Sequence, residues 1–233
     1  MNFDRRRTLL TSLLLIVYFG LHYYFLNSED IYHPIKDSLM RITTSFFCYY
    51  STEHVTFIFS TLFLLARNYG WRQSPLFWLR QKSRGAIINK YTQNTILLSL
   101  LVAVLHGAVG VLFTLFVVKN DQLVQNQFYT LALIYTGVLF LYLLIVGLIA
   151  LNLENFVSPM QAIILTIIIM FSAHFLGKGH WSPVVDLEIF PDAYLNHELT
   201  LNELILRPLR LAGISVILYL IGSNFIYRRD FLK

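Results

Sequence analysis

Long runs of apolar residues, separated by short polar breaks, dominate the pattern along this chain. Each run is long enough, or nearly so, to cross a hydrocarbon core of roughly 30 Å as a helix of about 20 residues. The six runs cover residues 9–26, 42–66, 95–118, 129–151, 160–176 and 209–227. In lipid, such a run satisfies its backbone hydrogen bonds internally as a helix. The pattern therefore predicts an all-α polytopic membrane protein, in which residues 1–233 form a single transmembrane domain of six helices.

The composition agrees with this class and excludes several others. Hydrophobic residues make up 56% of the chain, and the mean hydropathy is +0.60. No Gly-rich phosphate loop followed by Lys-Ser or Lys-Thr occurs, so a nucleotide site of that type is excluded. The single cysteine, Cys48, excludes an intrachain disulfide and a cysteine zinc cluster. Because no catalytic triad or metal-binding motif stands out either, we expect no catalytic or metal-binding residues and no enzymatic activity.

The distribution of Lys and Arg predicts the orientation. One set of loops and ends has twelve of these residues, namely Arg5, Arg6, Arg7, Arg67, Arg72, Arg80, Lys82, Arg84, Lys90, Arg228, Arg229 and Lys233. The opposite set has six, namely Lys36, Arg41, Lys119, Lys178, Arg207 and Arg210. Positive residues concentrate on the cytoplasmic side of membrane proteins. Both termini are therefore predicted to be cytoplasmic, and the basic start before residue 9 is predicted to lead into a retained first helix.

The connection between the second and third runs, residues 67–94, is longer than it needs to be and is strongly basic. Ser74-Pro75 suits a helix start and Gly85 a helix stop. Between them lies an apolar group followed by a basic one, consisting of Leu76, Phe77, Trp78, Leu79, Arg80, Lys82 and Arg84. We expect a short amphipathic helix at the inner membrane surface. Two interpretations stay open: interfacial anchoring by a positive loop, or docking of the apolar group into a partner's groove.

Two further motifs carry a family resemblance. The stretch Leu79-Arg-Gln-Lys-Ser-Arg-Gly-Ala-Ile-Ile88 and the segment Phe225-Ile-Tyr-Arg-Arg-Asp-Phe-Leu232 are similar to segments of small Gram-positive permeases that export, or give immunity to, bacteriocins. With its six runs and basic inner loop, the chain resembles the membrane subunit of an ABC-2-type ABC transporter, a type V exporter-like architecture. The chain departs from the family's pattern in having no acidic residue within 67–90, where such permeases often have one.

The resemblance implies a location, partners and a role. The chain would lie in a bacterial plasma membrane, and its inner loop would hold the coupling helix, seated on a separate ATP-binding subunit present in two copies. That subunit would bind ATP and Mg, so no cofactor is expected in this chain. A second permease, identical or different, would complete the complex. Further partners would be membrane lipid and the cargo, with no nucleic acid.

The implied function is the permease of an ATP-driven exporter. It would move an amphipathic, antimicrobial peptide or a hydrophobic substrate out of the cell or membrane. One alternative is an ion-coupled carrier or small-molecule-binding membrane subunit with no docked ATPase. A membrane scaffold or sensor is another.

The outer connection, residues 177–208, is too apolar for a freely solvated loop. Pro183 and Pro191 are expected to break it into pieces. The resemblance implies that short re-entrant helices form here, between the fifth and sixth membrane helices, and cap the outer mouth of the pathway.

Three polar residues interrupt the apolar runs. Glu53 and His54 lie within the second run, where a carboxylate near mid-bilayer would be costly. Glu53 either sits at the outer interface because the helix begins later, or lines the pathway. His106 lies beside Gly107, Ala108 and Gly110, small residues that permit close helix approach. We expect His106 to be an interhelical hydrogen-bonding group.

Overall fold

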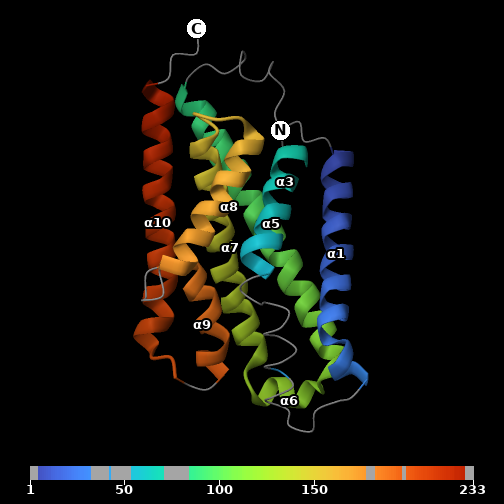
Figure 1. Cartoon of the computed structure of the whole chain (residues 1–233). Coiled ribbons are helices and arrows are strands. Elements are labelled where there is room, and N and C mark those ends of the chain that lie inside the picture. Colours follow the sequence, from blue (N-terminus) through green and yellow to red (C-terminus); the bar gives the residue numbers. More distant parts are fainter. Residues whose placement is uncertain are drawn as a thin grey trace.

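The computed structural model describes residues 5–32, 42, 54–70, 84–176, 182–195 and 198–228. Over these ranges the chain is helical and contains no strand. The long helices lie side by side along one axis (Figure 1). The start of α1 (Arg5–Tyr32) and the end of α10 (Leu201–Arg228) lie at the same end of the bundle, called the terminal end below (Figure 1). The opposite end is marked by the short helix α6 (Asn120–Gln125).

Helix α7 (Phe128–Leu153) is the centre of the bundle. It contacts α3 (Ser60–Gly70), α5 (Arg84–Val117), α8 (Pro159–Leu176), α9 (Pro183–Leu195) and α10. Leu139, Tyr142 and Leu143 are fully buried within it. A Cβ at Gly147 would lie 2.5 Å from Thr95 Cγ2 and 3.3 Å from the Phe63 ring, so glycine allows α7 to approach α5 and α3 closely.

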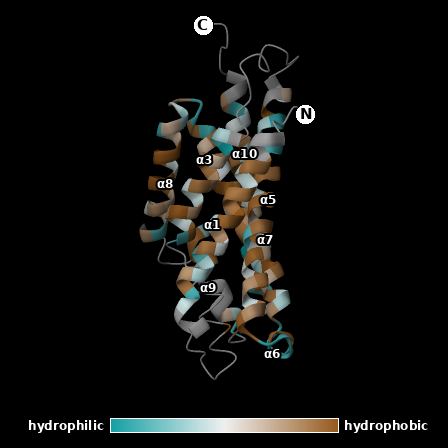
Figure 2. Ribbon diagram, turned by 90° about the vertical axis from the view of Figure 1, so that its right-hand side faces the viewer, coloured by the Kyte–Doolittle hydropathy of each residue, from teal (hydrophilic) through white to brown (hydrophobic). Residues whose placement is uncertain are grey.

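Among the described residues, four helices are long and apolar enough to cross a membrane. Their apolar segments are Leu9–Ser28 of α1, Ile88–Val117 of α5, Phe128–Leu153 of α7 and Asn202–Phe225 of α10. Helix α8 has a shorter apolar segment, Pro159–Phe175. Brown, hydrophobic colouring extends over these helices in Figure 2, whereas α6 is largely teal. The structure thus confirms an all-helical fold over the described residues, in which four helices are candidate membrane spans by length and composition, and the six spans stay a prediction.

The second apolar run is described only in its later part. The π-helix η1 (His54–Phe59) leads directly into α3. Ser60 Oγ donates to the Val55 carbonyl at 2.9 Å and lies 3.1 Å from the Tyr142 hydroxyl, which joins this turn to α7. A π-helical turn inserted before an α-helix is frequent at functional sites. Residues 43–53, including Glu53, lie outside the described ranges.

The helices on both sides of the inner loop extend beyond the apolar runs that are predicted to span the membrane. Helix α5 begins at Arg84, not at residue 95, and α3 continues to Gly70 rather than ending at residue 66. The 34 residues of α5 span roughly 51 Å, well beyond the roughly 30 Å hydrocarbon core, so its polar first turns need not lie in lipid. Gly85 therefore does not end a helix, and Arg84 belongs to α5 rather than to a separate coupling helix.

The predictions for the outer connection also need correction. Helix α9 is a single helix that begins at Pro183 and continues past Pro191 to Leu195, so the second proline does not break it. Helix α10 begins at Leu201, eight residues earlier than predicted, and Pro208 lies inside it. A capping box explains the early start: Thr200 N donates to Glu203 Oε2 at 3.0 Å, and Glu203 N donates to Thr200 Oγ1 at 3.3 Å.

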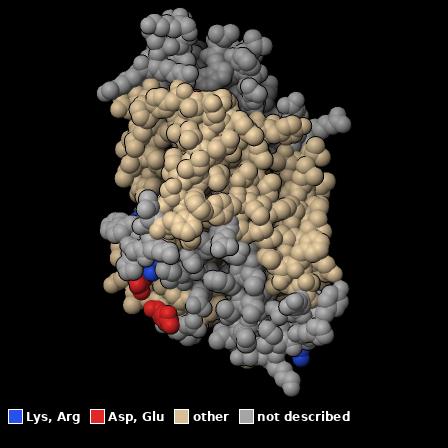
Figure 3. Space-filling model, viewed as in Figure 1, with Lys and Arg blue, Asp and Glu red and all other residues tan. Residues whose placement is uncertain are grey.

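One face of the bundle shows no charged side chains across its middle (Figure 3). On the face shown in Figure 3, the middle is a broad uncharged band, and the visible red and blue atoms lie mainly near the start of α10. Such a band is what a hydrocarbon environment requires, because isolated charges are costly there.

Candidate functional site

The predicted site residues fall into two groups in the structure. Arg84, His54 and His106 are described, as the first residue of α5, the first of η1 and a buried position in α5. The remaining predicted residues, which lie outside the described ranges, are Glu53, Leu76, Phe77, Trp78, Leu79, Arg80 and Lys82. Docking by an amphipathic helix within 71–83 thus stays a prediction.

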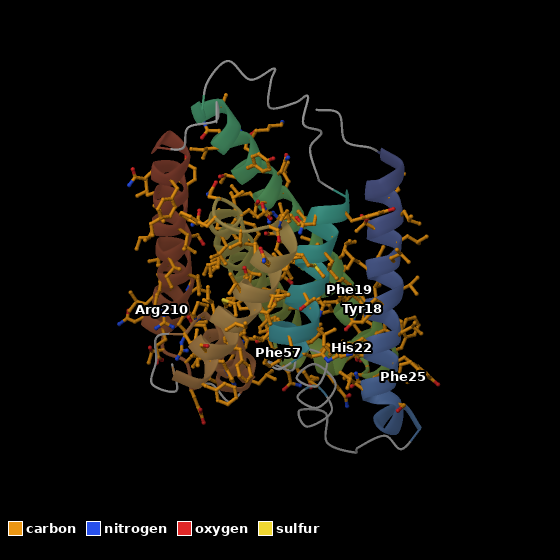
Figure 4. All side chains as sticks on the ribbon, turned by 45° about the horizontal axis from the view of Figure 1, so that its top comes forward. Tyr18, Phe19, His22, Phe25, Phe57 and Arg210 are labelled. Carbon is orange, nitrogen blue, oxygen red and sulfur yellow. The ribbon has the colours of Figure 1, made fainter. Side chains whose placement is uncertain are left out.

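The two described histidines belong to a larger group of rings, called the histidine cluster below. Its members are Tyr18, Phe19 and His22 of α1, His54 and Phe59 of η1, and His106 of α5. In Figure 4, Tyr18, Phe19 and His22 project from α1 toward the helix formed by η1 and α3. The cluster therefore joins three segments that are distant in the sequence.

Stacking and one hydrogen bond define the half of the cluster around His54. The His22 and His54 rings are stacked, with centroids 3.6 Å apart and an interplanar angle of 13°. Tyr18 stacks on His22 from the same helix at 5.9 Å, and its hydroxyl lies 2.7 Å from His54 Nε2. Two imidazoles and a phenol in contact form a chain of groups that can bind or pass a proton.

His106 occupies the other half of the cluster and is 1% exposed. Its ring meets Phe19 edge-on at 5.0 Å and Phe59 at 4.6 Å, so aromatic packing between helices dominates its surroundings. The next residue, Gly107, lies at the contact of α5 with α7, where a Cβ would overlap the Thr136 hydroxyl. The small residue beside His106 does permit close helix approach, as predicted.

A second polar group, called the α9–α10 charge cluster below, was not predicted as a site. Asp186 of α9 is fully buried, and its Oδ1 accepts hydrogen bonds from Arg207 Nη1 at 3.3 Å and from Arg210 Nη2. The two arginine side chains are 20% and 25% exposed. Asp186 Oδ2 is buried and has no hydrogen-bond partner among the described residues. One carboxylate therefore faces two guanidinium groups at the junction of α9 and α10.

A third polar contact lies toward the terminal end. Arg67 of α3 donates to Glu154, which follows α7, through two parallel bonds of 2.8 and 3.1 Å. The side chains are 8% and 19% exposed. This fork-to-fork geometry is the strongest form of the Arg–carboxylate pair. It fixes the end of α3, from which the chain continues toward residues 71–83, to the end of α7.

Signals for the missed residues are present in the sequence. Tyr18 and His22 are four residues apart, so they share one face of α1. Asp186 lies in the first turn of a helix that Ser182 caps, with Val184 N donating to Ser182 Oγ at 3.3 Å, and Pro183 occupies the first helical position. Within the described part of the chain, no three His, Cys, Asp or Glu side chains are placed to hold a metal ion.

The chain matches no protein-family model, no curated protein and no solved structure.

Proposed function

We propose that this chain is the membrane-spanning permease subunit of an ATP-driven exporter of the ABC-2 class. In this proposal six membrane helices place both termini in the cytoplasm of a bacterial cell. The basic connection around residues 71–83 docks on a separate subunit that binds ATP and Mg. The cargo is an amphipathic peptide or another hydrophobic molecule, moved out of the cell or membrane.

The observation that best supports this proposal is helix α9. It is a 13-residue helix between α8 and α10, packed against α7 and α8 at the end of the bundle opposite the two chain ends. Val184, Asp186 and Leu187 are buried, so α9 is part of the bundle and not a solvated loop. The resemblance leads us to expect such a helical cap at the outer mouth of the pathway.

The connection from α3 to α5 provides the second support. Gly70 and Arg84 end and begin two helices at the terminal end, so the thirteen residues between them connect helices at that end. The Arg67–Glu154 pair fixes the α3 side of this connection to α7. A force applied by an ATPase at the connection would therefore reach the central helix directly.

Copurification tests the docking step. The triple variant L76D/F77D/L79D should lose a stoichiometric ATP-binding partner, because three buried carboxylates would oppose seating in an apolar groove. The control, V124D, places an Asp at an apolar position of α6 that is 58% exposed and lies outside the span-length apolar segments. Loss of the partner in the first variant only is the expected result. A wild-type protein that transports with no ATPase bound would contradict the proposal.

A second candidate function is an ion-coupled carrier, and the histidine cluster favours it. Three imidazoles and a phenol inside the bundle supply protonatable groups where a proton-driven carrier needs them. The same experiment separates the two. A carrier would transport without an ATP-binding partner and would lose transport in H22Q and H54Q, whereas an ABC permease would require the partner.

A further inference from the structure

An open groove lies between α5, α7 and α10 in the half of the bundle near the terminal end. Its volume is about 340 Å³. Ile96, Leu148 and Val216 form part of its apolar lining. The groove lies within the apolar segments of three span-length helices, so its apolar part faces the depth at which lipid chains are found.

Polar groups gather at one edge of this groove. Asn89 and Gln93 of α5 lie one turn apart, and the Tyr219 hydroxyl of α10 donates to Asn89 Oδ1 at 3.0 Å. Lys90 is three residues before Gln93, which makes the two neighbours on the helix surface. An occupant must therefore combine one apolar tail with a polar head, and the lysine beside the edge favours a negative head.

We propose that this groove binds one acyl chain of an anionic phospholipid, with the headgroup at the edge formed by Asn89, Gln93 and Tyr219 and flanked by Lys90. The volume lies at the lower limit for ligand pockets, roughly 300–1,000 Å³, which suits a single chain and not a folded peptide. Basic sites between membrane helices on the cytoplasmic side bind anionic headgroups. The proposal rests on the predicted orientation, in which the terminal end of the bundle lies in the cytoplasm. It does not depend on an ATP-binding partner.

The site has a structural consequence for α10. Only 11% of the apolar segment of α10 is buried in the bundle. Helix α10 contacts α7 and α5 directly. An acyl chain bound in the groove would add to these contacts by filling the space between α10 and α5. Bound lipid should therefore strengthen the attachment of α10.

Filling the groove tests the proposal. Val216 is 57% exposed and lines the groove, whereas the adjacent Ile217 is 58% exposed and does not. V216W should displace the chain and I217W should not, although both add an indole to the same exposed helix. Native mass spectrometry of the full chain, with phosphatidylglycerol and phosphatidylcholine of identical chains, measures the bound lipid. We expect V216W to weaken phosphatidylglycerol binding at least tenfold and I217W to leave it unchanged. If V216W changes the elution of the protein in size-exclusion chromatography, which would indicate misfolding, V216F fills the groove with a smaller side chain and takes its place in the lipid-binding measurement.

The headgroup is tested separately. Wild-type protein should prefer phosphatidylglycerol, and K90Q should reduce this preference by about fivefold, the effect of one basic residue near an anionic surface. Equal binding of the two lipids by the wild type would overturn the assignment of an anionic headgroup. Unchanged binding in V216W, equal loss in V216W and I217W, or a copurified molecule of another class in the groove would overturn the lipid site itself. None of these outcomes bears on ATPase copurification, so the two proposals fail independently.

Discussion

Replacing Asp186 with Asn is expected to destabilise the protein more than any other single substitution considered. The change leaves Arg207 and Arg210 beside a neutral amide in a region from which water is largely excluded. Breaking a buried ion pair by removing one partner costs roughly 3–5 kcal/mol, and the partial exposure of both arginines places the expected loss near the lower limit, at about 3 kcal/mol. Thermal unfolding of the detergent-solubilised protein, followed by size-exclusion chromatography, measures the effect.

Glu203 supplies the matched control for this prediction. Its carboxylate lies 3.9 Å from Arg207, but its side chain is 44% exposed. E203Q retains a hydrogen-bond acceptor for the Thr200 cap and removes only this distant charge, so little change is expected. The triple variant D186L/R207M/R210M should recover most of the stability, because apolar residues can replace a buried ion pair. Equal melting behaviour of D186N and E203Q would show that the α9–α10 charge cluster does not hold these helices together.

The second large effect is expected at the Arg67–Glu154 pair. R67A removes both hydrogen bonds and leaves a carboxylate that is 19% exposed. Because Glu154 can turn partly toward solvent, we expect a loss of roughly 2–3 kcal/mol, below the cost for a fully buried pair. In the proposed complex with an ATP-binding subunit, the same variant should also uncouple ATP hydrolysis from transport, since the pair fixes α3 to α7 beside the proposed docking connection.

Two variants separate charge from geometry at this pair. R67K keeps the charge but cannot form the two parallel bonds, so an intermediate stability is expected. The exchange R67E/E154R restores opposite charges and should recover part of the loss. K119A removes a basic residue from an exposed position and serves as the control for charge alone. If R67A melts like K119A, the pair is not a structural link between α3 and α7.

The membrane helices could be predicted from the sequence because the hydrocarbon core imposes a minimum length on apolar runs. Residues 9–26, 129–151 and 209–227 fall within span-length helices, and residues 95–118 do so as far as Val117. The helix ends were less predictable. Apolarity marks where lipid begins and not where a helix ends, so the polar first turns of α5 were assigned to a loop.

Local capping signals in the sequence mark some of the helix starts that the apolar runs do not. Thr200 and Glu203 form a capping box that starts α10 eight residues before its apolar run. Gln161 bonds Ser158 in the same way at the start of α8, with Ser158 N donating to Gln161 Oε1 at 3.0 Å. Prolines were weighted too heavily, since both Pro191 and Pro208 lie inside helices.

The candidate sites depend on contacts between distant segments, which periodicity does not reveal. His54 and His106 stood out because polar residues are costly in apolar runs. Their association with His22 and Tyr18 requires the relative rotation of α1, η1 and α5. Likewise, Arg67 was interpreted only as a cytoplasmic charge, because its partner Glu154 is 87 residues away in the sequence.

The most direct test of the central claim is the side of the membrane on which the connection between α3 and α5 lies. Replacing Cys48, the only cysteine, with Ser provides a background for single-cysteine labelling. Trp78→Cys probes this connection, and Glu198→Cys probes an exposed position at the opposite end, just before α10. With a membrane-impermeant maleimide, the proposed permease should label at Glu198→Cys in intact cells and at Trp78→Cys only after permeabilisation. Labelling of Trp78→Cys in intact cells would contradict an ATPase-docking role for this connection.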